Sequence, residues 1–233
     1  VRVDGANWME TFRDSVQQGD LSGWLCPEAL EIVSDSGVHE VGCHGFRHIP
    51  LREGQVSEEE ARYELTCASK IAEQKGITLK TFVYPRNLVG HVGLLEEYGY
   101  LGFRGEDVSL RANGRVGSFL REFDVWQKAP PFKVTPGKLV AIPPSFFLNW
   151  QRGLRRAVPR EISRLRWKSI LESASTNDTV AGLYLHPHNV IDGPGTLDLL
   201  RDVLRMAADL RDRKGLSIMT QQEYCRQTRM LKW

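Results

Sequence analysis

The stretch His39-Glu-Val-Gly-Cys-His-Gly-Phe-Arg-His48 gives the main signal for the fold that we predict from the sequence. We interpret its first half as a short buried strand, and polar side chains follow where that strand ends. The same order recurs along the chain, because short apolar segments are followed by polar loops and then by amphipathic helical segments. This alternation is typical of an α/β protein with a parallel sheet covered by helices.

The predicted strands and helices alternate over most of the chain. The clearest helix follows Ser57, which is an N-cap, and Glu60 three residues later completes a capping box. We expect helices over residues 27–36, 57–76, 91–98, 159–173 and 196–210. We expect strands over residues 39–43, 79–84, 100–103, 139–142, 179–185 and 216–219. A right-handed βα series of this length forms either an open doubly wound sheet or a barrel.

Composition excludes several classes of protein. The chain has 233 residues, 41% of them hydrophobic, and a formal net charge of +2. This supports a sizeable core and predicts no nucleic-acid partner, because a nearly neutral chain has no global field that attracts nucleic acid. No apolar segment reaches the roughly 18 residues that a membrane span requires. The four cysteines form no CxxC pair, and we expect a reducing compartment and therefore a cytoplasmic protein.

Polar side chains that can carry chemistry follow directly after the predicted strands. They are His44, His48, Arg86, Asn87, Arg104, Ser145, His186, His188 and Asn189. Because the carboxyl ends of parallel strands share one face, we expect these side chains to converge there. Polar loops follow strands in any protein, which is the plainer interpretation.

His44 and His48 form a His-x3-His pair. On a helical turn, residues four apart lie on one face, so both imidazoles can reach one metal ion. Such a site needs at least one more protein ligand, usually a carboxylate. Two surface histidines are the alternative, and the position at a strand end beside Gly42 and Gly45 favours the metal site.

Arg86 and His186 are the other candidates for chemistry. Arg86 follows strand 79–84, where its guanidinium can hold a carboxylate by two hydrogen bonds. An ordinary turn set by Pro85 fits equally well. His186 ends strand 179–185 and can protonate a leaving amine near neutral pH. A hydrogen-bonded structural histidine is the alternative.

Three segments together resemble the motifs of the polysaccharide deacetylases, also called the NodB homology domain or carbohydrate esterase family four. Residues 37–48 resemble the metal motif of that family. Residues 82–87, with their Pro-Arg-Asn sequence, resemble its arginine motif. Residues 183–189 are similar to its last motif, which carries the catalytic histidine. The resemblance covers residues 25–220.

The resemblance implies a distorted (β/α) barrel of about seven strands. It also implies a divalent metal, usually zinc, and removal of an N-acetyl group from a sugar or polysaccharide in surface-glycan biosynthesis. By matching position, His44 and His48 are metal ligands, Arg86 orients the catalytic base and His186 is the general acid. Trp126 weakly matches the family's Asp-Trp motif and is assigned to substrate binding.

The chain departs from the family before His44, because no Asp-Asp pair is found there. In the family, a first strand ends in paired aspartates, one a base and the other a metal ligand. Three explanations stay open: that strand lies outside this chain, Asp4 substitutes, or the protein is a catalytically inactive relative that binds carbohydrate or acts as a scaffold. The expected domains are a segment over 1–24, a deacetylase-like domain over 25–220 and a basic tail over 221–233.

A basic stretch covers residues 152–168. From Arg152 to Lys168 it carries seven cations against Glu161. Such a stretch can contact an inner membrane surface that bears a lipid-linked glycan, or an anionic polymer. A solvated helix face is the plainer interpretation, and we prefer it.

Overall fold

The chain divides into two units, Val1–Val41 and Gly42–Trp233. The computed structural model describes residues 2–3, 6–22, 24–106, 114–132, 137–149, 153–193 and 195–230. The first unit contains β1 (Arg2–Val3), β2 (Ala6–Asn7), α1 (Trp8–Gln18) and α2 (Pro27–Asp35). Its two strands pair antiparallel.

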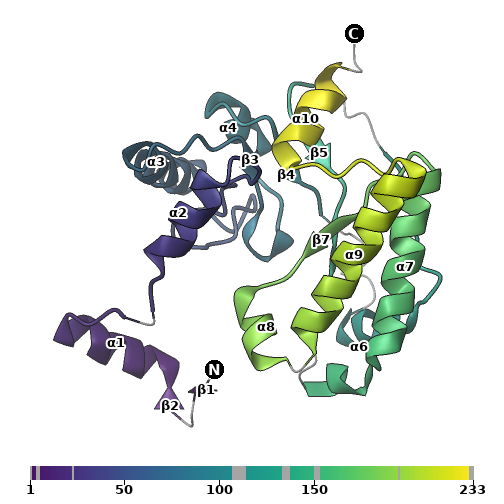
Figure 1. Cartoon of the computed structure of the whole chain (residues 1–233). Coiled ribbons are helices and arrows are strands. Elements are labelled where there is room, and N and C mark those ends of the chain that lie inside the picture. Colours follow the sequence, from purple (N-terminus) through teal and green to yellow (C-terminus); the bar gives the residue numbers. More distant parts are fainter. Residues whose placement is uncertain are drawn as a thin grey trace. The chain divides into compact units, whose positions relative to one another are not determined.

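The second unit carries the remaining strands and helices (Figure 1). Its strands are β3 (Thr81–Phe82), β4 (Gly102–Arg104), β5 (Val140–Ile142), β6 (Ser145–Phe147) and β7 (Gly182–Tyr184). Its α-helices are α3 (Glu58–Gln74), α4 (Val92–Glu97), α6 (Gly114–Leu120), α7 (Arg160–Thr176), α8 (Pro187–Asp192), α9 (Thr196–Lys214) and α10 (Gln221–Met230). Three 3-10 turns connect them: η1 (Pro85–Asn87), η2 (Arg121–Phe123) and η3 (Gly153–Ala157).

Parallel pairing sets the order of the strands. One sheet has the order β3-β4-β5, and β6 pairs with β7 in a second sheet. Cys43 extends the first sheet by an isolated parallel bridge to Phe82. Its N–H donates to the Thr81 carbonyl at 2.9 Å, and its carbonyl accepts from the Val83 N–H at 2.8 Å. The predicted strand over 39–43 therefore contributes a single paired residue to the sheet.

The structure contradicts the predicted distorted barrel. In the described part of the chain, the parallel strands form sheets of three and two strands, and no closed barrel is seen. Pro143 and Pro144 lie between β5 and β6 and have no N–H to donate, so the strand ladder stops there. Residues 216–219 were expected to form the last strand, but they form none and lead into α10.

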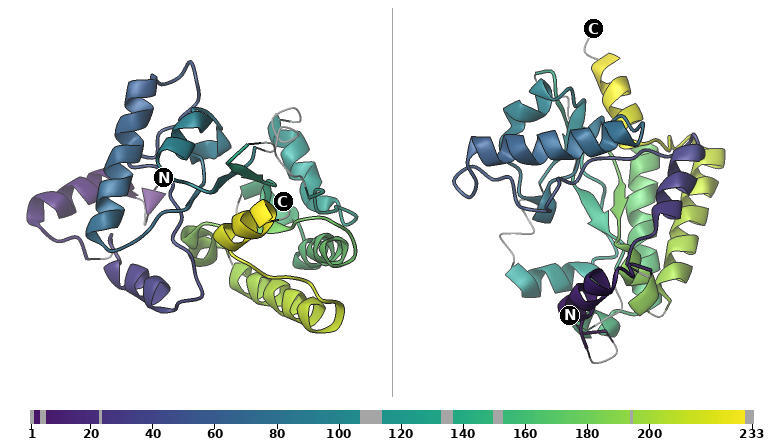
Figure 2. Two further views of the ribbon diagram at one scale, coloured as in Figure 1. Left: turned by 90° about the horizontal axis from the view of Figure 1, so that it is seen from above. Right: turned by 90° about the vertical axis from the view of Figure 1, so that its left-hand side faces the viewer.

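Apolar side chains of the second unit are buried in three clusters. Helices α3 and α4 cover β3 and β4, with Leu65 and Phe82 fully buried. Helices α7 and α9 lie side by side (Figure 2) and bury Trp167 and Leu199 against β6 and β7. Helix α10 occupies residues expected in the basic tail, yet it packs on β4 and β5 with Cys225 fully buried. No helix in the described ranges combines the length and apolar character that crossing a bilayer requires.

The approach of α10 to the sheet depends on Gly102. A Cβ at this position would lie 2.4 Å from the Val140 carbonyl oxygen and 2.5 Å from Cys225 Sγ. We expect Gly102→Ala to lower the free energy of unfolding by about 1–3 kcal/mol, because β5 or α10 must move. Gly93→Ala in α4 is the matched control, since its Cβ would meet open space. Chemical denaturation of both variants measures the difference, and equal midpoints for the two variants would contradict this packing.

Candidate functional site

The loop that leaves the first sheet at Cys43 presents two histidines. His44 Nδ1 lies 2.6 Å from the Val83 carbonyl oxygen. Because a carbonyl only accepts hydrogen bonds, Nδ1 carries the proton and donates it, and the lone pair of Nε2 stays free. The rings of His44 and His48 are 4.7 Å apart between centroids. His48 has a left-handed backbone, with φ of 59°, which turns the chain so that the two rings meet.

A buried carboxylate fixes this loop. Glu64, on α3, is 0% exposed and accepts hydrogen bonds from the Phe46 N–H at 2.9 Å and the Arg47 N–H at 2.8 Å. Its other oxygen accepts from Arg47 Nε at 2.5 Å. Burial alone raises the pKa of Glu64, but the Arg47 side chain and the two backbone donors outweigh it, so the pKa lies below its ordinary value. The charged carboxylate therefore holds Phe46 and Arg47, two of the three residues between His44 and His48.

The segment after β7 brings a third histidine to the same place. The backbone N–H of His186 donates to Asn189 Oδ1 at 2.8 Å, which begins α8. The ring of His186 stacks on that of His188 with 5.2 Å between centroids. His186 is close enough to His44 for its charge to lower the pKa of that imidazole. His44 therefore contacts the ring of His48 and lies within electrostatic reach of His186.

Arg104 and Asn87 complete this group, which we call the histidine cluster: His44, His48, Asn87, Arg104, His186 and His188. Arg104 ends β4 and donates from Nη2 to Asn87 Oδ1. Its guanidinium carbon lies 4.9 Å from the centroid of the Tyr184 ring. The prediction assigned no role to Arg104, although the same signal that marked the histidines, a polar residue directly after a strand, also marked it.

The electrostatics of the cluster favour a neutral His44. Partial burial is the largest cause and lowers the pKa of His44, and the hydrogen bond to Val83 opposes it. The charges of His48, Arg104 and His186 lower the pKa further. A neutral imidazole with a free Nε2 lone pair is the form that can bind a metal ion.

The described residues supply only part of the predicted metal site. His44 and His48 offer two imidazoles, and the hydrogen bond from His44 Nδ1 to Val83 is the orientation that metal-binding histidines commonly show. No group of three His, Cys, Asp or Glu side chains with a suitable arrangement occurs within the described ranges. Asp4, the candidate substitute for the family's aspartates, lies outside the described residues.

Two predicted site residues lie at the edge of the cluster or away from it. Arg86 is exposed in η1 and has a left-handed backbone with φ of 56°, next to Asn87 at 54°. No ion pair of Arg86 is found among the described residues. Trp126 is 78% exposed, and its backbone N–H donates to Asp124 Oδ1 at 3.2 Å. Trp126 makes no contact with the histidine cluster in the described part of the chain.

The basic stretch is only partly a solvated face. Arg166 is buried in α7, where it pairs with the buried Glu122 and donates from Nε to Gln127 Oε1 at 2.9 Å. Burial lowers the pKa of Arg166, and Glu122 opposes that shift. Arg160 pairs with Asp202 of α9 at 2.6 Å. These contacts are structural, and Arg152 lies outside the described residues.

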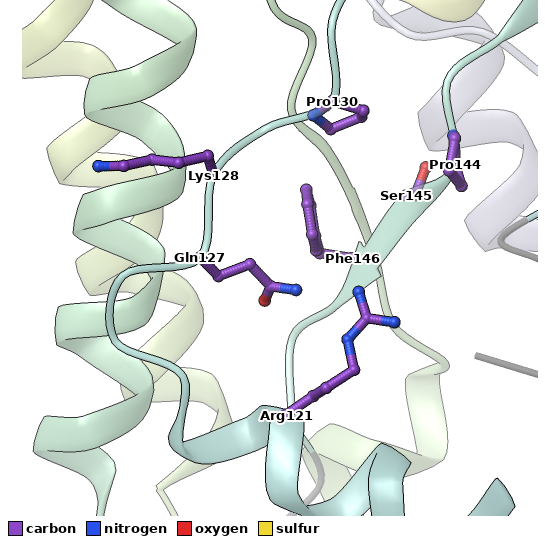
Figure 3. A pocket seen from close by; sticks show the side chains of 7 residues that line it. All are labelled: Arg121, Gln127, Lys128, Pro130, Pro144, Ser145 and Phe146. Atoms are coloured by element: carbon purple, nitrogen blue, oxygen red, sulfur yellow. The ribbon is translucent and has the colours of Figure 1, made fainter. Parts of the chain in front are cut away.

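A pocket of about 180 Å³ lies apart from these histidines. It is lined by Arg121, Gln127, Lys128, Pro130, Pro144, Ser145 and Phe146. Figure 3 shows the Arg121 and Gln127 side chains directed into it, whereas Lys128 points away. Ser145, one of the polar residues that follow predicted strands, lines this pocket, whereas the residues predicted for catalysis, metal binding and substrate binding do not.

The comparisons with known proteins do not assign the chain to a family. No protein-family model matches the sequence, and no curated protein matches it.

Proposed function

We propose that the chain is a hydrolase that removes an N-acetyl group from a sugar or a polysaccharide during surface-glycan biosynthesis. One observation carries the proposal: His44 and His48, which follow Cys43, lie with His186, which follows β7, although the two segments are far apart in the sequence. Active sites of parallel α/β barrels lie at the carboxyl ends of the strands, and histidine is the side chain that most often transfers protons in catalysis.

Amide hydrolysis needs an attacking water and a proton for the leaving nitrogen. When water attacks the acetyl carbon, the C–N bond breaks, acetate leaves and the nitrogen must take up a proton. We assign that proton to the His186 imidazole, whose backbone is fixed by Asn189 and whose ring stacks on His188. Arg86, exposed beside Asn87, is the candidate to orient a carboxylate base, and no described residue is assigned as that base.

His44 and His48 are the residues that would hold a divalent metal, most suitably zinc. Imidazole nitrogen is a preferred zinc ligand, and His44 Nε2 keeps its lone pair free for that purpose. When bound, such a metal polarises the acetyl carbonyl and acidifies bound water.

A binding or scaffold protein without catalysis is the second candidate. It is favoured by one observation, that no carboxylate joins His44 and His48 in a ligand group within the described residues. Such a protein would keep the cluster for carbohydrate binding and release no acetate.

We also propose a cytoplasmic location and a contact of the basic stretch with an anionic membrane surface. All four cysteines are free thiols, which suits a reducing, cytoplasmic environment. Arg156, Arg164 and Lys168 are exposed and are the described cations of the basic stretch that could meet an anionic membrane surface.

Substitution of His48 tests the proposal. Incubation of the purified chain with zinc and N-acetylglucosamine oligomers is expected to release acetate, which proton NMR quantifies. His48→Ala is expected to abolish acetate release and to bind less zinc, because it removes one of two imidazole ligands. Metal content by mass spectrometry provides the second readout.

His91→Asn is the matched control for this experiment. His91 lies outside the cluster, with Nε2 at 3.2 Å from the Val56 carbonyl oxygen, and asparagine tolerates its left-handed backbone. This variant should release acetate like the wild type. Acetate release that persists unchanged in His48→Ala would refute the assignment, and a folded wild type that binds zinc and the oligomers without releasing acetate would favour the scaffold.

A further inference from the structure

Arg104 is a partly buried cation whose neighbours are neutral. Asn87 accepts a hydrogen bond from its Nη2, and Tyr184 offers the face of its ring at 4.9 Å. No carboxylate pairs with Arg104 anywhere in the described ranges. Loss of hydration lowers the pKa of Arg104. The charge is therefore partly removed from water, and no carboxylate of the described residues lies beside it.

Arg166 shows how the fold compensates the charge of a buried arginine. Arg166 is buried more deeply than Arg104, and the fold supplies it with the Glu122 carboxylate, the Gln127 amide oxygen and the Phe147 carbonyl at 3.2 Å. A buried charge without a partner costs several kcal/mol by general estimates, so buried cations are normally paired. Arg104 lacks that compensation among the described residues, which indicates that its partner arrives with a ligand.

The groups around Arg104 favour a ligand with a negative charge. Arg104 and His186 lie beside the same aromatic ring, because the Arg104 guanidinium carbon is 4.9 Å and the His186 ring centroid 6.3 Å from the centroid of Tyr184. Their charges both lower the pKa of His44. Arg104 is also held in place before a ligand binds, because Asn87 has a fixed left-handed backbone in η1 and Tyr184 supports the guanidinium face. A preorganised guanidinium binds carboxylate and phosphate groups through parallel hydrogen bonds.

We infer that Arg104, with the imidazole of His186 beside the same Tyr184 ring, forms a binding site for a compact oxyanion, a carboxylate or a phosphate. The inference rests on the proposed function for its place in the reaction. Under that function, the oxyanion is either the acetate product or an anionic group on the N-acetylated sugar. Both sources present the same chemistry to Arg104, and the experiment below separates them.

Calorimetric titration of the full chain, freed of metal with a chelator, tests this site. The probes are sodium acetate, N-acetylglucosamine 1-phosphate and neutral N-acetylglucosamine. Arg104→Gln is expected to weaken anion binding about 10- to 100-fold, the loss typical of a charge-assisted hydrogen bond, and to leave binding of the neutral sugar unchanged. Arg213→Gln, which removes an exposed arginine paired with Asp209, is the matched control and should bind all three probes like the wild type.

Two outcomes support the inference and identify the anion. A loss for acetate alone assigns Arg104 to the product, and a loss for the sugar phosphate as well assigns it to an anionic group of the substrate. The inference is overturned if neither anion binds the wild type, if Arg104→Gln binds both anions as tightly as the wild type, or if the neutral sugar loses as much affinity as the anions.

Arg104→Lys keeps the test valid if Arg104→Gln fails to fold. Lysine retains the charge and loses the planar fork, so we expect anion affinity between those of the wild type and Arg104→Gln, with a thermal midpoint near that of the wild type. Anion binding is measured without catalysis. A chain that binds anions through Arg104 and releases no acetate would therefore refute the proposed hydrolase alone, and one that releases acetate without this binding would refute only the anion site.

Discussion

Replacement of His186 by alanine is expected to slow acetate release by about 10²–10⁴-fold, the range for loss of a general acid or base. The reason is that the leaving nitrogen then has no positioned proton donor beside the cluster. Because that proton moves only in the transition state, kcat should fall while KM changes little. Steady-state acetate release by proton NMR over a range of oligomer concentrations measures both constants.

The fold of the His186→Ala variant must be intact for this comparison. Its backbone is held through the N–H that donates to Asn189, which alanine retains, so we expect circular dichroism and the thermal midpoint to match the wild type. His91→Asn is again the control for a histidine outside the cluster. A folded His186→Ala variant with wild-type kcat would show that His186 does not protonate the leaving group.

Removal of Glu122 is expected to cause the largest loss of stability. The free energy of unfolding should fall by about 3–5 kcal/mol in Glu122→Ala, because Arg166 is left as a buried charge without its carboxylate. Both side chains are nearly excluded from water, at 5% exposed for Glu122 and 4% for Arg166. Denaturation by urea gives the difference.

An exposed ion pair provides the matched control for Glu122→Ala. Asp209 and Arg213 pair at 2.7 Å on the solvent face of α9, and Asp209→Ala should cost less than about 1 kcal/mol. Adding Arg166→Met to Glu122→Ala should restore part of the lost stability, since an apolar side chain then fills the site. Equal losses for Glu122→Ala and Asp209→Ala would mean that the buried pair does not hold η2 to α7.

Local sequence signals predicted α2, α3, α4, α7 and α9, whereas α1, α6, α8 and α10 were not expected. Ser57 accepts a hydrogen bond from the Glu60 N–H at 3.2 Å, as its N-cap position indicated, and α3 follows from Glu58. The pairing of the strands could not be predicted in the same way, because apolar character alone does not show which residues pair. Pro143 and Pro144 interrupt the pairing that a barrel requires, and the helix containing Cys225 fills space against β5.

The candidate site shows the same limit. The sequence singles out His44, His48 and His186 because each lies in a loop that follows a predicted strand, and parallel strands bring such loops to one face. Their roles stay predictions. The role of Glu64 could not be predicted. Its carboxylate accepts hydrogen bonds from backbone N–H groups of the loop between His44 and His48, and the position of Glu64 in the sequence does not show that contact. The role that we propose for Arg104 depends on the lack of a partner carboxylate among the described residues, and the sequence alone does not reveal that lack.

We propose that imidazoles from two segments far apart in the sequence surround one site that binds a metal ion. The direct test is a zinc titration of the chain labelled with ¹⁵N-histidine, followed by NMR of the ring nitrogens and assigned with single variants. We predict that the signals of His44, His48 and His186 change together, with one midpoint. Zinc-dependent changes at His44 and His48 that leave His186 unaffected at saturation would contradict it.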